Sequence, residues 1–76
     1  MKIYPNPTKG SLRIDLENLS SQTAKMSICN SYGSVVFSKR VDTTSNLTID
    51  LELKSGLYFL TVEDGNKSYT KKFVVN

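Results

Sequence analysis

Residues 56–75, GLYFLTVEDGNKSYTKKFVV, decide the fold that the sequence predicts. From Tyr58 to Glu63 an aromatic or aliphatic residue occupies every second position, which is the pattern of a strand with one face in a core. Asp64-Gly65 follows, and this dipeptide between two strand patterns favours a hairpin turn. A second strand is predicted from Ser68 to Val75. The core-facing residues of this hairpin are expected to be Tyr58, Leu60, Val62, Phe73 and Val75.

The rest of the chain repeats the strand pattern. Alanine, the best helix former, occurs once, whereas β-branched and aromatic residues are abundant. Five further strands are predicted at residues 2–4, 11–16, 24–29, 34–41 and 47–52. Turn residues recur between them at the spacing of an antiparallel sandwich. The sequence therefore predicts an all-β fold, a small immunoglobulin-like antiparallel β-sandwich of about seven strands. The expected core positions in these strands are Leu12, Ile14, Leu16, Ala24, Met26, Ile28, Val35, Phe37, Val41, Leu47, Ile49 and Leu51.

The connections also have the composition of β-turns. Asn6-Pro7-Thr8-Lys9-Gly10 is predicted to form a type I turn with proline second and a glycine at positive φ. Asn30 to Gly33 is interpreted as a hairpin loop closed by glycine. Asn18 to Thr23 and Asp42 to Asn46 are predicted to be polar loops. No segment has a pattern that favours a helix.

Composition excludes several classes of function. The chain has 76 residues, no histidine, no tryptophan and one cysteine, with a net charge of +3. A catalytic unit that needs histidine, a histidine zinc site and an internal disulfide are therefore excluded. A domain of this size buries only ~60% of its unfolded surface. We expect one domain over residues 1–76 that is not an enzyme and holds no cofactor or metal. No apolar run approaches the length of a transmembrane segment.

The remaining chemical candidates have simpler interpretations. Glycosidases use two carboxylates as acid and base, and the chain has two such pairs, Asp15/Glu17 and Asp50/Glu52. Both pairs fall on outward strand faces, so they are interpreted as solvated surface residues. Acidic loop residues are too few in each loop for a calcium site. Cys29 lies on a polar strand face and is interpreted as an unreactive thiol. The lysines near Tyr69 fit a protected edge strand better than a nucleic-acid site. The loop residues considered are Asp42, Asp64 and Asn66, and the lysines are Lys67, Lys71 and Lys72.

The ordered motifs nevertheless resemble a known family. The chain is similar to the type A C-terminal sorting domain of the type IX secretion system of Bacteroidetes. The resemblance covers almost the whole chain and rests on the order of its motifs. These are Tyr4-Pro5-Asn6-Pro7-Thr8-Lys9-Gly10, Ser11 to Leu16, Met26 to Val36 with its glycine turn, Ser55-Gly56-Leu57-Tyr58 to Val62, and Tyr69 to Val75. Cys29 departs from the pattern, since the family usually has an ordinary strand residue there.

The resemblance implies a role in secretion. Such a domain is the tail of a larger secreted protein, of which this chain would be a fragment. It directs a cargo, attached in cis at its N-terminal side, through the outer-membrane translocon. A sortase-like cysteine protease then usually removes the tail, and the cargo is released or anchored at the cell surface. The implied localisation is the periplasm in transit, followed by secretion or surface display.

The terminal strand is the candidate contact with the translocon. A partner can add to a strand edge through main-chain hydrogen bonds. We expect lysine charges and apolar side chains to supply the contact, although the apolar residues could equally complete the core. The candidate residues are Lys71, Lys72, Phe73, Val74 and Val75. The residues interpreted as fold determinants are Pro5, Asn6, Pro7, Gly10, Gly33, Gly56 and Tyr58.

Two further expectations concern partners. Exposed edges in a small sandwich could support a weak homodimer by strand pairing. The alternative function is a non-catalytic adhesive or carbohydrate-binding module. Carbohydrate binding would need a row of exposed aromatic residues, and Phe59 is the main aromatic residue expected on an outward face.

Overall fold

The computed structural model describes residues 1–16, 19, 21–43 and 46–76. Glu17 and parts of the two predicted polar loops lie outside these residues. Seven strands form, as the sequence predicts, and no helix occurs in the described part of the chain. The strands are β1 (Lys2–Tyr4), β2 (Ser11–Asp15), β3 (Thr23–Asn30), β4 (Val35–Asp42), β5 (Leu47–Asp50), β6 (Gly56–Asp64) and β7 (Lys67–Val75).

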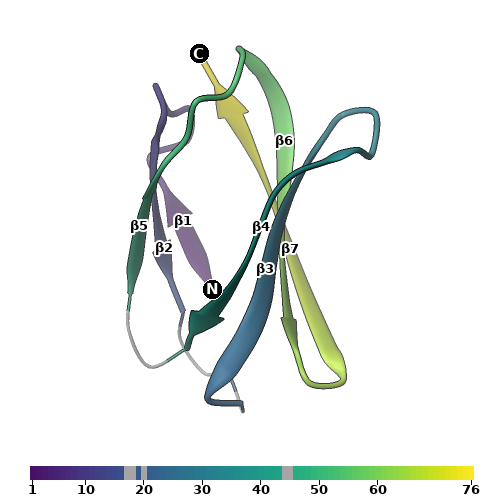
Figure 1. Cartoon of the computed structure of the whole chain (residues 1–76). Coiled ribbons are helices and arrows are strands. Elements are labelled where there is room, and N and C mark those ends of the chain that lie inside the picture. Colours follow the sequence, from purple (N-terminus) through teal and green to yellow (C-terminus); the bar gives the residue numbers. More distant parts are fainter. Residues whose placement is uncertain (17–18, 20, 44–45) are drawn as a thin grey trace.

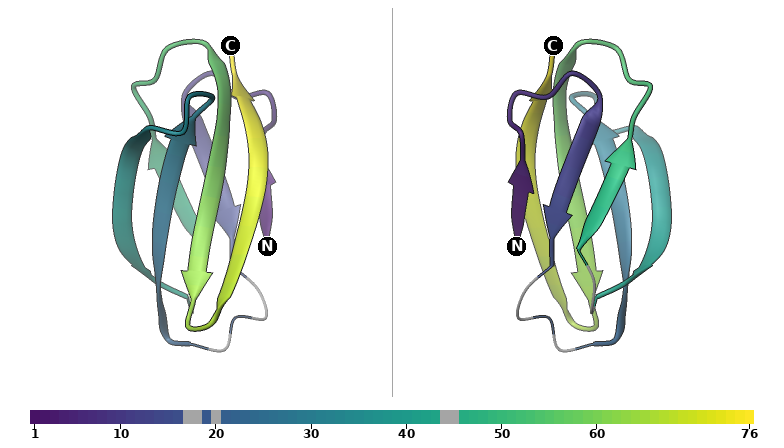
Figure 2. Two further views of the ribbon diagram at one scale, coloured as in Figure 1. Left: turned by 90° about the vertical axis from the view of Figure 1, so that its right-hand side faces the viewer. Right: turned by 90° about the vertical axis from the view of Figure 1, so that its left-hand side faces the viewer.

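The strands form two antiparallel sheets that face each other (Figure 1). One sheet has the order β1-β2-β5 and the other the order β4-β3-β6-β7. An immunoglobulin-like sandwich likewise places its first, second and fifth strands in one sheet and its third, sixth and seventh in the other. The predicted fold class is therefore confirmed. Figure 2 shows that β1 and β7 are the edge strands on one side of the sandwich, and β5 and β4 on the other.

The core lies between the sheets and follows the alternation of the sequence. Ile14, Met26 and Leu60 are completely buried, and the hairpin of β6 and β7 contributes Phe73. Leu47, Ile49 and Phe37 are only partly buried and pack against the core. The complete buried apolar set is Leu12, Ile14, Leu16, Ala24, Met26, Ile28, Val41, Leu51, Tyr58, Leu60, Val62, Phe73 and Val75.

The turn between β6 and β7 differs from the prediction by one residue. Asp64 pairs with Lys67, so Gly65-Asn66 forms the loop and Asp64 is the last residue of β6. Gly65 has a φ of 61°, which suits a tight hairpin. Asp64 is 1% exposed, and its carboxylate accepts a hydrogen bond from the Ser21 N–H at 2.8 Å. The carboxylate thus connects this turn to the segment that precedes β3.

The prediction for Val35 is wrong. The register of β3 and β4 shifts between Ile28, which pairs with Phe37, and Cys29, which pairs with Val35. This β-bulge places one extra residue in β4, and because side chains alternate between faces, Val35 moves to the outward face. Val35 is consequently 61% exposed, whereas Val41, beyond the bulge, is buried as predicted.

Candidate recognition surface

The terminal strand β7 separates the five predicted recognition residues into two groups. Phe73 and Val75 are 0% and 3% exposed and belong to the core, whereas Val74 is 38% exposed. Lys71 and Lys72 are exposed as well. The apolar contact expected from Phe73 and Val75 is thus made within the domain. The side chains of Lys71, Lys72 and Val74 are available on the folded surface.

Tyr58 anchors β7 at its C-terminal half. It pairs with Phe73 across β6 and β7, and their rings stack with centroids 5.7 Å apart. The Tyr58 hydroxyl donates a hydrogen bond of 2.7 Å to the Lys54 carbonyl. An aromatic pair adds about 0.5–1.5 kcal/mol beyond its buried area. Tyr58 therefore fixes both the terminal strand and the segment that leads into β6.

The side chain of Asn6 covers the outer edge of β7. Its Oδ1 accepts a hydrogen bond from the Val74 N–H at 3.0 Å, and its Nδ2 donates one to the Lys72 carbonyl at 3.3 Å. One amide side chain thus replaces the main chain of a neighbouring strand. Asn6 is exposed, so its contribution lies in these two bonds and not in burial.

Thr8 extends this cover to the end of the chain. Its N–H donates to the Val74 carbonyl and its carbonyl accepts from the Asn76 N–H, both at 2.8 Å. These bonds form a parallel bridge between Thr8 and Val75. The Thr8 hydroxyl donates to the Ser11 carbonyl and accepts from the Gly10 N–H. Thr8 is 1% exposed. The sequence predicts only a turn position for Thr8. Its place in the Tyr4–Gly10 motif is the one signal in the sequence for a larger role.

The motif contains two cis peptide bonds, Tyr4–Pro5 and Asn6–Pro7. Gly10 has a φ of 138°, and a Cβ added there would lie 3.1 Å from the Leu51 carbonyl oxygen. Its own carbonyl accepts a hydrogen bond from the Leu51 N–H at 2.6 Å. Gly10 therefore requires both the positive φ and the absence of a side chain.

The other two glycines in the predicted set have different surroundings. Gly33 has a φ of 85° in the hairpin between β3 and β4, with nothing within 4 Å of an added Cβ. Its N–H donates to the Asn30 carbonyl at 3.0 Å. Gly56 begins β6, where an added Cβ would meet only the Tyr58 ring at 3.9 Å. Gly33 thus sets a turn, while Gly56 has no close neighbour.

An apolar strip on the outer face of the larger sheet adjoins the exposed part of β7. Val74 pairs with Leu57, and Lys72 pairs with Phe59. Leu57 is 37% exposed, nearly the same as Val74, and Phe59 is half-buried. Sequence reasoning missed Leu57 as part of this surface, because only the cross-strand register places it beside Val74. We call Leu57, Phe59, Lys72 and Val74 the terminal patch.

The acidic residues and the cysteine outside β7 do not form one site among the described residues. No group of three or more histidine, cysteine or acidic residues that could hold a metal ion occurs among the described residues. A hollow of about 390 Å³ is lined by hydroxyl and charged residues, and among the described residues Glu63 supplies its carboxylate. Cys29 is a free, half-buried thiol. Residues 1–16, 19, 21–43 and 46–76 contain no helix that is long and apolar enough to span a membrane. The hollow is lined by Ser21, Thr23, Lys25, Arg40, Glu63 and Gly65.

The sequence of the chain matches a known protein family. The model of a family described as a secretion system C-terminal sorting domain matches residues 2–76. The chain belongs to this family. The resemblance to type IX sorting domains is therefore confirmed, and the domain acts as a signal that directs an attached cargo to a secreted or surface location.

The sorting domain also has a relative of known name. It is 33% identical over 76 residues to the ulvan lyase NLR42 of Nonlabens ulvanivorans. The match covers 97% of this chain but 14% of the lyase, so the domain spans a small part of that relative. In the relative, a sorting domain is thus joined to a much longer protein whose name is that of an enzyme.

Proposed function

We propose that this sorting domain is recognised by the type IX translocon through the exposed residues of β7, while the rest of the strand maintains the fold. The observation that carries this proposal is the separation within β7. Val74 is 38% exposed and Lys71 and Lys72 are exposed, whereas Phe73 and Val75 are buried. A partner that meets the folded domain would contact the terminal patch and Lys71.

The proposed sequence of events follows from this role. The domain forms the C-terminal part of a longer protein, and a cargo precedes residue 1. The cargo passes through the periplasm, crosses the outer membrane and is released or anchored at the cell surface. A sortase-like cysteine protease removes the domain upstream of Lys2. The domain itself catalyses no reaction and needs no cofactor.

A reporter fusion tests the sorting function. The domain is joined to the C-terminus of a periplasmic reporter in a bacterium that has the type IX machinery, and in a strain that lacks the translocon. We expect the reporter outside the first strain and in the periplasm of the second. Retention in the periplasm of the first strain would contradict the proposal. A reporter without the domain serves as the control.

The burial of the β7 side chains determines which variants test recognition separately from folding. Truncation after Thr70 would remove Phe73 and Val75, which are buried in the core. Loss of export by that variant would therefore not separate folding from recognition. Substitutions of exposed residues such as Val74 and Lys72 separate the two.

We also propose that the domain forms a weak homodimer by pairing of strand edges. Asn6 and Thr8 occupy the edge of β7 from Lys72 onward. β4 pairs only with β3, so its other edge is open within the described residues. Self-association would then use β4 or the part of β7 that precedes Lys72. Sedimentation at increasing protein concentration tests this proposal, and a single monomeric species throughout would contradict it.

A further inference from the structure

The outer edge of β7 is divided into a covered half and an open half. Val74 uses both its N–H and its carbonyl outside the sheet, toward Asn6 and Thr8. Because main-chain groups of alternate residues in an antiparallel strand point to the same side, those of Thr70 and Ser68 point the same way. Within the described residues, β7 pairs with β6 and is bridged to Thr8, and no strand lies against Ser68 or Thr70.

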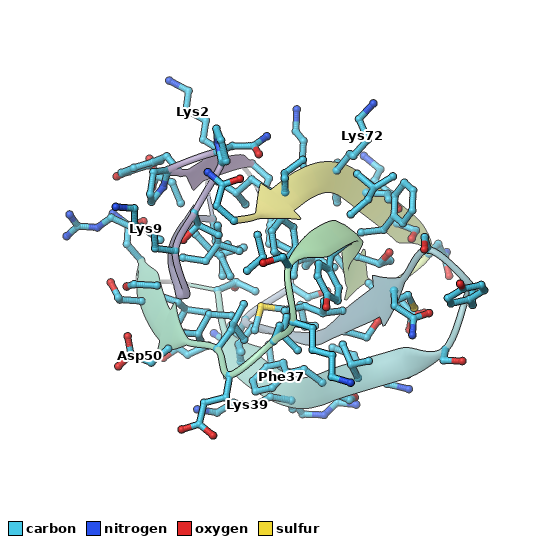
Figure 3. The ribbon with its side chains drawn as sticks, turned by 90° about the horizontal axis from the view of Figure 1, so that it is seen from above. Lys2, Lys9, Phe37, Lys39, Asp50 and Lys72 are labelled. Atoms are coloured by element: carbon cyan, nitrogen blue, oxygen red, sulfur yellow. The ribbon has the colours of Figure 1, made fainter. Side chains whose placement is uncertain are left out.

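Two lysines, Lys67 and Lys71, belong to this open half, which we call the open edge (residues 67–71). Lys71 pairs with Leu60, which is completely buried, yet Lys71 is exposed. Its side chain therefore lies at the margin of the core and extends into solvent. Lys2 of β1 and Lys72 of β7 extend from the same side of the molecule (Figure 3).

We infer that the open edge accepts an extended acidic segment of a partner protein as an added strand. This inference rests on the proposed function and names the chemistry of the partner. Ser68 and Thr70 offer main-chain donors and acceptors to such a strand, as in other cases of β-strand addition. Lys67 and Lys71 supply positive charge beside it, and charge complementarity favours a partner rich in aspartate and glutamate. The covered half excludes the added strand beyond Lys72.

A peptide probe tests the inference on the purified domain. The probe is the synthetic peptide acetyl-Thr-Glu-Val-Glu-Val-Glu-Thr-amide, and the matched probe has lysine at each glutamate position. We expect the acidic peptide to change the NMR shifts and slow the exchange of the Ser68 and Thr70 amides. Binding should weaken as salt is added, because exposed charges are screened. No change at these amides, or equal binding of the lysine peptide, would overturn the inference.

Two proline variants distinguish strand addition from charge alone. Ser68→Pro removes an outward N–H of β7, and proline is tolerated where the N–H of an edge strand faces solvent. Ser38→Pro makes the same change on β4, where Ser38 pairs with Ser27 and alternation directs its N–H outward. We expect Ser68→Pro to weaken peptide binding about tenfold and Ser38→Pro to leave it unchanged. Equal binding by both variants would overturn strand addition.

A charge variant keeps the test decisive if a proline variant fails to fold. Lys67→Glu with Lys71→Glu reverses charge at two exposed positions, and Lys9→Glu with Lys54→Glu does so elsewhere. We expect only the first pair to abolish binding of the acidic peptide. The reporter assay distinguishes failure of the sorting function from failure of strand addition. Retention of the unmodified fusion contradicts the sorting proposal. Equal export of the unmodified and Lys67→Glu/Lys71→Glu fusions contradicts strand addition and the contact of Lys71 with the translocon, and leaves the sorting function itself standing.

Discussion

The Asn6 side chain accepts a hydrogen bond of 3.0 Å from the Val74 N–H, although the two residues are 68 positions apart. This bond joins the segment nearest the cargo to the terminal strand. The same side chain donates to the Lys72 carbonyl at 3.3 Å. The asparagine of the Tyr4–Gly10 motif thus supplies both a donor and an acceptor to a strand edge, which aspartate cannot do when ionised.

The first motif of the domain, Tyr4 to Gly10, holds its last strand in place. Both Asn6 and Thr8 bond to the main chain of β7, not to its side chains. The motif therefore fixes the position of β7 while its outward side chains remain available. Edge strands invite pairing with other chains, and covering part of the edge limits such pairing.

Replacement of Asn6 by alanine should loosen the end of β7. Asn6→Ala removes two hydrogen bonds at an exposed site, so we expect the free energy of unfolding to fall by about 1 kcal/mol. Amide exchange at Val74 should accelerate. Asn46→Ala changes an exposed asparagine elsewhere and should leave both quantities unchanged. Urea unfolding and hydrogen exchange measure them, and an unaltered Val74 exchange rate would contradict the role of Asn6.

Gly10 should tolerate alanine less well than Gly33. At Gly10 the φ of 138° is combined with a distance of 3.1 Å from the added Cβ to the Leu51 carbonyl oxygen. At Gly33 the φ is 85° and the space is open. We expect Gly10→Ala to cost about 3 kcal/mol and Gly33→Ala about 1 kcal/mol. Thermal unfolding compares the two variants, and equal losses would show that the Leu51 contact is unimportant.

The strands could be predicted because one sheet face is buried throughout. Alternation identified residues such as Ile14, Met26 and Leu60 as core positions, and all three are completely buried. The same rule failed at Val35. A β-bulge depends on the pairing of two strands, and the sequence of β4 alone contains no sign of it. Asp64 was likewise misplaced, since Asp64-Gly65 and Gly65-Asn66 both suit a two-residue turn.

The candidate site could be predicted only in part. The sequence predicts that it lies on the terminal strand and leaves open whether its apolar residues face a partner or the core. The sheet register pairs Phe73 with the buried Tyr58 and Val74 with the exposed Leu57, so Phe73 lies in the core and Val74 on the surface. The hydrogen bonds of Asn6 could not be foreseen, since they join residues at opposite ends of the chain.

Two valines of similar exposure separate recognition from stability. Val74 is 38% exposed on β7, and Val36 is 41% exposed on β4. Each substitution by serine should change the free energy of unfolding by less than about 0.5 kcal/mol, as is usual at surfaces. We expect Val74→Ser to reduce export of a reporter fusion and Val36→Ser to leave it normal. Normal export of both fusions would remove Val74 from the recognition surface.

Phe73 should behave in the opposite way. Its side chain is completely buried and stacks on Tyr58 with the ring centroids 5.7 Å apart. Phe73→Ala should cost about 3–5 kcal/mol, a large share of the stability of a small domain. Export should fall in proportion to the fraction of unfolded protein. Phe73→Leu retains much of the buried volume and should restore most of the export. Failure of a stably folded Phe73→Leu variant to be exported would instead indicate a direct contact with the translocon.

Lysines at core-facing positions of both edge strands should keep the larger sheet from pairing with other copies. Lys39 of β4 pairs with Met26 and Lys71 of β7 pairs with Leu60, and both partners are completely buried. The two lysines lie on opposite edge strands of one sheet. Charged residues at such positions discourage edge-to-edge association with another copy, because a strand of this basic domain would desolvate them without supplying the opposite charge that an acidic partner strand brings.

Replacement of these lysines by valine should therefore promote self-association. We expect Lys39→Val with Lys71→Val to raise the association constant about tenfold, with little change in unfolding. Lys9→Val with Lys54→Val removes the same charge at exposed positions outside the strands and is the matched control. Sedimentation velocity over a range of concentrations measures association. Equal behaviour of the two double variants would show that net charge, and not its position on the edges, limits self-association.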